Sequence, residues 1–201
     1  MDMRIRQWKA LDYFDPAPVL IGLRDYERSG ALQDVPYEVA SLRTRELKPY
    51  GERRQCAMFA YLTGRVTGTF VYVAYCEASD YDAVMHHRVG DEIRFVPVQM
   101  KELPPSFLPF TKDLQGLIDG LKDKYPTSSD LTVAVYVNRD VSFRVQHLDL
   151  SGLNLGALWL FGGCDQTGDT WRVIGNLLSG NCRTEVFGYP AREAAADGSV
   201  G

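Results

Sequence analysis

The spacing of apolar residues predicts two helical regions in the first third of the chain. The first opens with Asp15, a preferred N-cap residue that is followed directly by proline, and it stops at Gly30. The second covers 37–63 and is interrupted at Pro49, because proline lacks an amide donor and disfavours helix just before it. Its later part ends on Gly64, since glycine is a common C-terminal stop for a helix.

Three consecutive strands and another helix follow. The segments 69–76 and 81–88 are rich in β-branched and aromatic residues, and 92–101 alternates between apolar and polar positions. The next segment has helical periodicity. It predicts an amphipathic helix with Thr111 as its N-cap and an end before Pro126.

The C-terminal part of the chain completes the predicted fold class. Residues 131–138 have the composition of a buried strand, with which we expect 142–150 to pair. One further strand is expected within 156–161, and a short helix near 171–178 with Asp169 as its cap. Helices, a three-strand meander, a crossover helix and a further strand predict an α/β domain, with a central mixed sheet flanked by helices.

Size and composition are those of one folded domain. The chain has 201 residues, of which 45% are hydrophobic and 24% charged, so wholesale disorder is excluded. We place the domain at 1–189 and expect 190–201 to form a flexible tail, because this end is small and polar. No apolar run is long enough to cross a membrane and no secretion signal opens the chain, so we expect a cytoplasmic protein.

The cysteines do not suggest a metal or disulfide framework. They lie far apart, without a C-x-x-C pair and without a nearby histidine at zinc-ligand spacing. We expect reduced thiols that lie mostly in the core. The four residues are Cys56, Cys76, Cys164 and Cys182.

A predicted hairpin brings polar side chains together on one face of the sheet. Gly90 and Asp91 suit a two-residue turn between the second and third strands. With that turn, Asp82 lies opposite Gln99, and alternation places Lys101 on the same face. Neighbouring Cβ atoms across a strand pair are roughly 5 Å apart, so an acid, an amide and an amine converge there. Such a group can bind a hard cation through its oxygen atoms.

These residues and their order resemble a known family. A helix with a glutamate, a meander with Asp82 on its second strand and Gln99-x-Lys101 on its third look like the PD-(D/E)xK, or restriction-endonuclease-like, nuclease superfamily. The helix and strand over 112–138 fit the αβββαβ core of that superfamily, so the resemblance covers about 37–138.

The resemblance implies a role for each matching residue. Asp82 and Gln99 would bind the metal, and Lys101 would be catalytic. Gln99 stands where the family usually has Asp or Glu, which removes one negative charge and weakens metal binding. Glu52 is the helical glutamate that we choose as the other catalytic residue, because it shares a helical stripe with Cys56. The alternatives are Glu38 and Glu46.

The implied activity is hydrolysis of phosphodiester bonds in nucleic acid, first of all DNA, with Mg²⁺ or Mn²⁺ as the cofactor. The main alternative is a catalytically inactive binding or regulatory module that keeps the nuclease fold. A third is an unrelated domain that binds a small molecule.

A local basic segment is the only further sign of a nucleic-acid surface. The net charge of −4 argues against binding through overall charge. The candidate contacts are Arg43, Arg45, Arg53 and Arg54. Taken alone, this segment is better explained as a solvated helix face. His86, on the Asp82 face, is either a further metal ligand or a structural histidine. The aromatic residues of the C-terminal part can stack bases or fill the core, and they are Trp159, Phe161 and Trp171.

Overall fold

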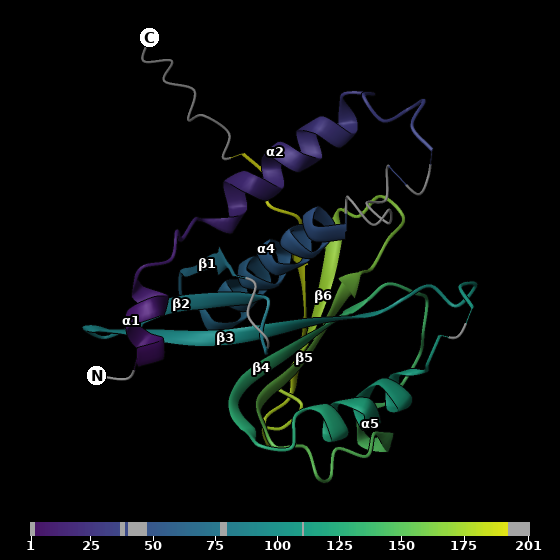
Figure 1. Ribbon diagram of the computed structural model, residues 1–201. Helices are drawn as coiled ribbons and strands as arrows, with labels where there is room; N and C mark the ends of the chain where they lie inside the picture. The colour runs from purple at the N-terminus through teal and green to yellow at the C-terminus, as the bar shows by residue number, and fades with distance from the viewer. Residues whose placement is uncertain (1–2, 37–38, 40–47, 77–79, 110, 193–201) are drawn as a thin grey trace.

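The structure is a computed structural model that describes residues 3–36, 39, 48–76, 80–109 and 111–192 (Figure 1). The helices of this part are α1 (Met3–Lys9), α2 (Pro16–Arg28), α4 (Lys48–Thr67) and α5 (Leu114–Lys124). The strands are β1 (Val71–Tyr75), β2 (Ala83–Val89), β3 (Glu92–Leu103), β4 (Ser128–Val137), β5 (Leu155–Gly163), β6 (Thr170–Gly175) and β7 (Arg183–Gly188). A short 3₁₀ turn covers Val145–His147.

The strands form one mixed, curled sheet in the order β1 to β7 (Figure 1). β1, β2 and β3 are an antiparallel meander, and α5 carries the chain to β4, which is parallel to β3. β5 is parallel to β4, whereas β6 and β7 are added as antiparallel neighbours. The predicted α/β class and the mixed sheet are confirmed.

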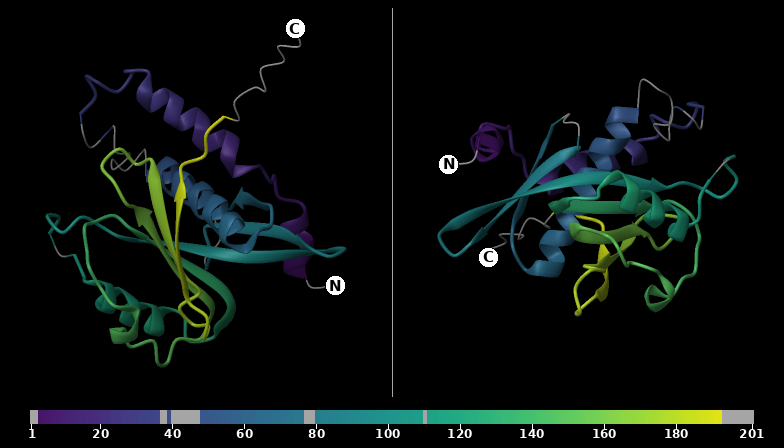
Figure 2. Two further views of the ribbon diagram at one scale, coloured as in Figure 1. Left: turned by 180° about the vertical axis from the view of Figure 1, so that it is seen from behind. Right: turned by 60° about the horizontal axis from the view of Figure 1, so that its bottom comes forward.

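Helices cover both faces of the sheet, and each face has its own apolar core. α4 packs on one face, where Phe59 is buried together with Val98 and Met100. α5 packs on the other face, where Ile118 is buried with Val133. α2 lies against the outer side of α4 (Figure 2).

Caps explain where two of the helices begin. The Asp15 carboxylate accepts a hydrogen bond of 2.9 Å from the Ala17 amide, as the sequence predicts for α2. In α5 the cap is Asp113, which accepts from the Gly116 amide at 2.7 Å. The prediction of Thr111 as the cap is wrong, because the first helical residue is Leu114.

The predicted bounds of α4 need two corrections. Pro49 lies in the first turn and does not interrupt the described helix, because amides of the first turn have no partner within the helix. The helix also continues through Gly64 to Thr67. Gly64 serves close packing instead, since a Cβ there would lie 2.9 Å from the Thr69 carbonyl oxygen.

The C-terminal predictions are partly wrong. Residues 142–150 form no strand, and the parallel neighbour β5 occupies the edge of β4. The expected helix near 171–178 is strand β6, where Trp171 and Val173 are buried and Arg172 is exposed in a period of two.

The expectation of core cysteines holds for only part of the set. Cys56 is buried, but Cys164 and Cys182 are exposed; all four described thiols are free. None of the helices in the described ranges is both long and apolar enough to span a membrane.

Candidate functional site

The hairpin between β2 and β3 has the predicted register. Val89 pairs with Glu92 across the turn, where Gly90 has a φ of 60°, and Ala83 pairs with Val98 at the far end. The Asp82 amide donates to the Val98 carbonyl at 2.9 Å, which continues the ladder by one residue. Asp82 therefore lies beside Gln99, as expected.

The side chains of Asp82 and Gln99 belong to one hydrogen-bonded network. The Asp82 carboxylate accepts from Nε2 of Gln99 and, at 2.7 Å, from the Met100 amide. Nε2 of Gln99 also donates to the Met100 carbonyl at 3.2 Å. The Tyr125 hydroxyl donates to Oε1 of Gln99 at 2.9 Å. Gln99 is only 7% exposed, and these bonds satisfy its amide.

The end of the strand pairing explains why the Asp82 carboxylate lies there. The registered pairing of β2 with β3 ends at Ala83. The Met100 amide thus has no backbone acceptor in that pairing, and the Asp82 side chain takes over as its acceptor. The network therefore connects β2 and β3 beyond their last backbone pair.

Lys101 lies on the same face, next to the end of α5. Its Nζ is 5.9 Å from the centroid of the Tyr125 ring, and Nζ of Lys124 is 5.2 Å from the same centroid. Burial lowers the pKa of Lys101, and the charge of Lys124 lowers it further. The negative charges of Asp82 and Glu52 act in the opposite direction.

Glu52 belongs to α4, on the other side of the sheet from Tyr125. α4 covers the face opposite to Tyr125, and Cys56 of its predicted stripe is buried there. Burial raises the pKa of Cys56 well above its usual range, and the charges of Asp82 and Glu52 add to the effect. The charges of Asp82 and Glu52 thus act on the pKa of Cys56 on one side of the sheet and on that of Lys101 on the other. Glu38 and Glu46 lie outside the described residues.

The oxygen atoms of this network that a divalent cation could use are those of Asp82, Gln99 and the Met100 carbonyl. No cluster of three or more His, Cys, Asp or Glu side chains suited to a metal occurs in the described ranges. Mg²⁺, however, is often held by only one or two carboxylates together with water and substrate phosphate.

The orientation of the Gln99 amide decides whether these groups fit a cation. Its nitrogen faces Asp82 and its oxygen faces Tyr125, so the oxygen is turned away from the carboxylate. A half-turn of the amide would present the oxygen beside Asp82, and the Tyr125 hydroxyl could then accept from the nitrogen. After this single rotation, Asp82, Gln99 and the Met100 carbonyl would offer oxygen atoms of the kind that Mg²⁺ and Mn²⁺ accept.

The predicted arginines are only partly within the described chain. Arg43 and Arg45 lie outside it. Arg53 lies over the ring of Tyr75, with 5.4 Å between its guanidinium carbon and the ring centroid. Arg54 forms an ion pair of 2.5 Å with Glu27 of α2.

His86 has a structural environment. Its ring is stacked on Tyr72 at 4.9 Å and meets the edge of Tyr13 at 4.4 Å. Burial lowers its pKa, and the charge of His87 adds to the effect. His86 thus takes part in an aromatic cluster rather than in the network of Asp82 and Gln99.

Two residues of the site were not expected from the sequence. They are Lys124 and Tyr125, at the end of the amphipathic helix before Pro126. The alternation of residues along the strands does not indicate that this helix ends over the hairpin. The only available signal was an aromatic residue and a lysine beside a helix stop.

Comparison of the chain with protein-family models, with curated proteins and with solved structures finds no match. The interpretation of the site depends on its geometry.

Proposed function

We propose that the protein is a metal-dependent nuclease that hydrolyses phosphodiester bonds in nucleic acid, with DNA as the first substrate to test. The observation that carries the proposal is the hydrogen-bonded pair of Asp82 and Gln99 at the end of the β2–β3 pairing, with Lys101 on the same face beside Tyr125. The order α4, β1, β2, β3, α5, β4, with β4 parallel to β3, supports a restriction-endonuclease-like core.

The cofactor in this proposal is Mg²⁺ or Mn²⁺, which would polarise the scissile phosphate and orient the attacking water. Asp82 would hold it together with Gln99, whose amide would be turned to offer its oxygen, and Glu52 would act as a further catalytic residue. Neutral Gln99 makes this a weaker cation site than one with a second carboxylate.

Lys101 supplies the catalytic amine. An amine whose pKa is lowered by burial accepts a proton from water more readily at neutral pH than an exposed lysine that stays fully charged. In its charged form, Lys101 stabilises the negative charge that develops on the phosphate. Lys124 adds a second positive charge near the same ring.

A second candidate function is a non-catalytic nuclease-fold module that binds nucleic acid. It is favoured by the closed network, in which Asp82, Gln99 and Tyr125 satisfy one another without a cation. In that case the network stabilises the sheet and no metal is needed.

Cleavage assays separate the two candidates. Wild type, Lys101→Ala and the exposed-lysine control Lys9→Ala are compared on single-stranded and duplex DNA and RNA, with Mg²⁺, Mn²⁺ or chelator. We expect Lys101→Ala to reduce metal-dependent cleavage by about a hundredfold or more, because a positive charge beside the reacting phosphate is lost. Lys9→Ala should cleave like wild type.

Melting temperatures measured in parallel report on the metal. A cation that binds the native state raises the melting temperature by mass action. Absence of both cleavage and metal-induced stabilisation in wild type would favour the non-catalytic module. Full activity in Lys101→Ala would show that the site has been placed wrongly.

A further inference from the structure

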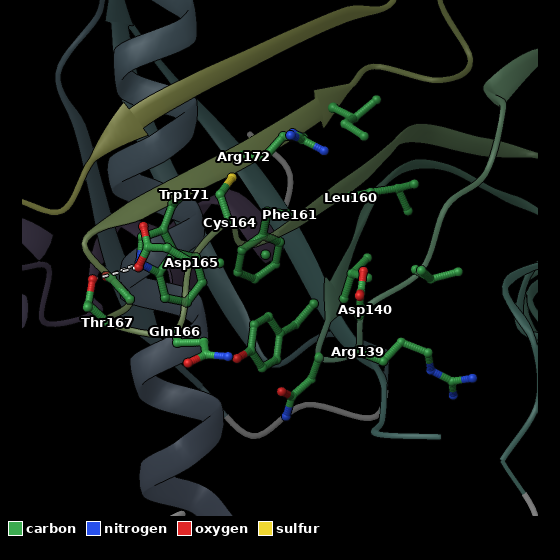
Figure 3. A pocket seen from close by; sticks show the side chains of 18 of the residues that line it. Arg139, Asp140, Leu160, Phe161, Cys164, Asp165, Gln166, Thr167, Trp171 and Arg172 are labelled. Atoms are coloured by element: carbon green, nitrogen blue, oxygen red, sulfur yellow. Dashed lines mark hydrogen bonds between the residues drawn. The ribbon is translucent and has the colours of Figure 1, made fainter. Parts of the chain in front are cut away.

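A cleft of about 880 Å³ opens at the carboxyl ends of the parallel strands β4 and β5 (Figure 3). Tyr136 and Phe161 line it from the ends of these strands, and Arg172 lines it from β6. Its volume is in the range of clefts that take small-molecule ligands. The cleft is distinct from the network of Asp82 and Gln99.

The cleft stays open because the loops that leave β4 and β5 are held on different sides. Arg139, just after β4, donates to the Pro104 carbonyl at 2.6 Å and to the Lys112 carbonyl at 3.1 Å. The turn after β5 is held by α2, since Arg24 donates to the Thr167 carbonyl at 2.8 Å. Loops that diverge from neighbouring parallel strands form the crevice in which α/β sheets bind ligands.

One side of the cleft is aromatic. Tyr136 is half-buried and stacks on Trp171, with 5.9 Å between ring centroids and 23° between planes. Next to it, Gly162 and Gly163 end β5 without side chains. A Cβ on Gly162 would lie 2.6 Å from the Val137 carbonyl oxygen, so this position requires glycine. The cleft thus offers a flat ring beside bare backbone.

Arginines supply positive charge that the described residues only partly neutralise. Arg172 is exposed and has no ion pair in this part of the chain, and Arg139 is bonded to neutral carbonyls rather than to a carboxylate. Nε of Arg24 is buried and has no acceptor among the described residues. Three carboxylates also line the cleft: Asp140, Asp165 and Glu27, which forms ion pairs with Arg54 and Arg24. Hydrogen bonds from Thr170 and Thr167 hold the pKa of Asp165 well below its usual range.

The cleft is close to the candidate catalytic group. Tyr136 pairs with Glu102, the neighbour of Lys101 on β3. The Glu102 carboxylate also accepts a hydrogen bond of 2.8 Å from Asn138, just beyond β4. Lys101 faces the α5 side of the sheet and Tyr136 the α4 side, so a chain that passes Lys101 would reach Tyr136 around the end of β4.

We propose that this cleft binds an unpaired segment of single-stranded nucleic acid, which passes around the bare end of β5 at Gly162 and Gly163. A base would lie on Tyr136, on the α4 side of the sheet, and the next phosphates would lie at Arg172 and Arg139, on the α5 side. A planar ring and guanidinium groups are the side chains that bind single strands without regard to sequence. A base inside a double helix is stacked between its neighbours, so only an unpaired base can lie on the Tyr136 ring. The inference rests on the proposed nuclease function and specifies its substrate as single-stranded or frayed.

Thiol footprinting of the wild-type protein localises the ligand. Cys164 lines the cleft and is exposed, whereas Cys182 is an exposed thiol beyond the far end of β6. With chelator present to prevent cleavage, an unlabelled oligothymidylate should slow alkylation of Cys164 by about tenfold and leave Cys182 unchanged. Equal rates at Cys164 with and without the oligonucleotide would overturn the proposal.

Affinity measurements with matched variants test whether Arg172 contacts a phosphate. Arg172→Gln should weaken binding of a labelled single strand by about tenfold. The slope of log affinity against log salt concentration should fall by about the amount of one phosphate contact. Arg88→Gln, an exposed strand arginine on the β2–β3 hairpin, should bind like wild type. Gly163→Val should also weaken binding, because the new side chain would occupy part of the cleft. The fold should accommodate it, since a Cβ at Gly163 meets only one atom within 4 Å, at 3.9 Å.

The outcomes separate this inference from the proposed function. Protection of Cys164 without cleavage under any condition would leave the binding cleft in place and remove the nuclease. If the wild type cleaves but Arg172→Gln and Gly163→Val bind the single strand as tightly as wild type, the nuclease proposal stands and the proposal that the cleft binds the strand is overturned. Duplex DNA that binds as tightly and protects Cys164 equally would also overturn it.

Discussion

Tyr125, the residue that follows α5, donates its hydroxyl to Oε1 of Gln99 at 2.9 Å and so fixes the direction of the Gln99 amide on β3. With that oxygen occupied, Nε2 of Gln99 faces Asp82. The crossover helix therefore controls whether the hairpin presents a nitrogen or an oxygen beside the carboxylate. Replacing any member of this network should change stability or cation binding in a predictable direction.

Tyr125→Phe should destabilise the protein by about 1–2 kcal/mol, because the ring remains and the buried Gln99 oxygen loses its donor. Urea unfolding measures the change. Tyr26→Phe, at an exposed tyrosine of α2, should stay within about 0.5 kcal/mol of wild type. Equal stability of Tyr125→Phe and wild type would mean that Tyr125 does not orient the amide.

Gln99→Glu should destabilise the metal-free protein at neutral pH. The hydrogen bond from the Gln99 amide to Asp82 would be replaced by repulsion between two carboxylates. The pKa of the new carboxyl is raised by its neighbour Asp82. The mutant is therefore closest to wild type at low pH and loses stability as the pH rises through that pKa.

Addition of millimolar Mg²⁺ should reverse this loss, because a cation between the two carboxylates replaces the missing donor. Thermal melts with and without Mg²⁺ measure the effect. Gln146→Glu, at an exposed position of the 3₁₀ turn, controls for the added charge. A Mg²⁺ response no larger than that of wild type would argue against a cation site at Asp82.

The stability of the protein should fall as the pH drops below about 6.5, through His86. Burial lowers the pKa of His86, so the unfolded chain takes up protons at a higher pH than the folded one. His86→Phe keeps the stack on Tyr72 and removes the titration. Its urea midpoint should fall less steeply than that of wild type from about pH 7 to about pH 5. His147→Gln, at an exposed residue, should behave like wild type, and an unchanged slope in His86→Phe would contradict the assignment.

Gly64→Ala and Gly22→Ala should have opposite effects, although both glycines lie inside helices. A Cβ at Gly64 would meet the Thr69 carbonyl oxygen at 2.9 Å, whereas nothing lies within 4 Å at Gly22. We expect a loss of about 1–3 kcal/mol for Gly64→Ala. Gly22→Ala should gain about 0.5–1 kcal/mol, because alanine favours helix. Denaturant unfolding of the pair tests whether Gly64 serves packing, and a stabilised Gly64→Ala would refute it.

The sequence predicted the local features of this protein well. The register of Asp82 and Gln99 depends only on a two-residue turn and on alternation, and both act between neighbours in the chain. The Asp15 cap of α2 and the end of α5 before Pro126 follow from similarly local chemistry. The order of strands and helices indicated a mixed sheet, because a crossover helix between strands makes them parallel.

Contacts between distant segments could not be predicted in this way. Tyr125 reaches Gln99 only because α5 packs across the sheet and ends over the hairpin, and no local pattern encodes that position. Gly64 resembles a helix stop until the Thr69 carbonyl is seen against it. The cleft at Tyr136 depends on the parallel pairing of β4 with β5 and on loops held by α2 and by the segment before α5. Local sequence patterns determine most of the elements, although β6 and 142–150 show that tertiary pairing decides some of them. The packing of the elements then decides which side chains meet.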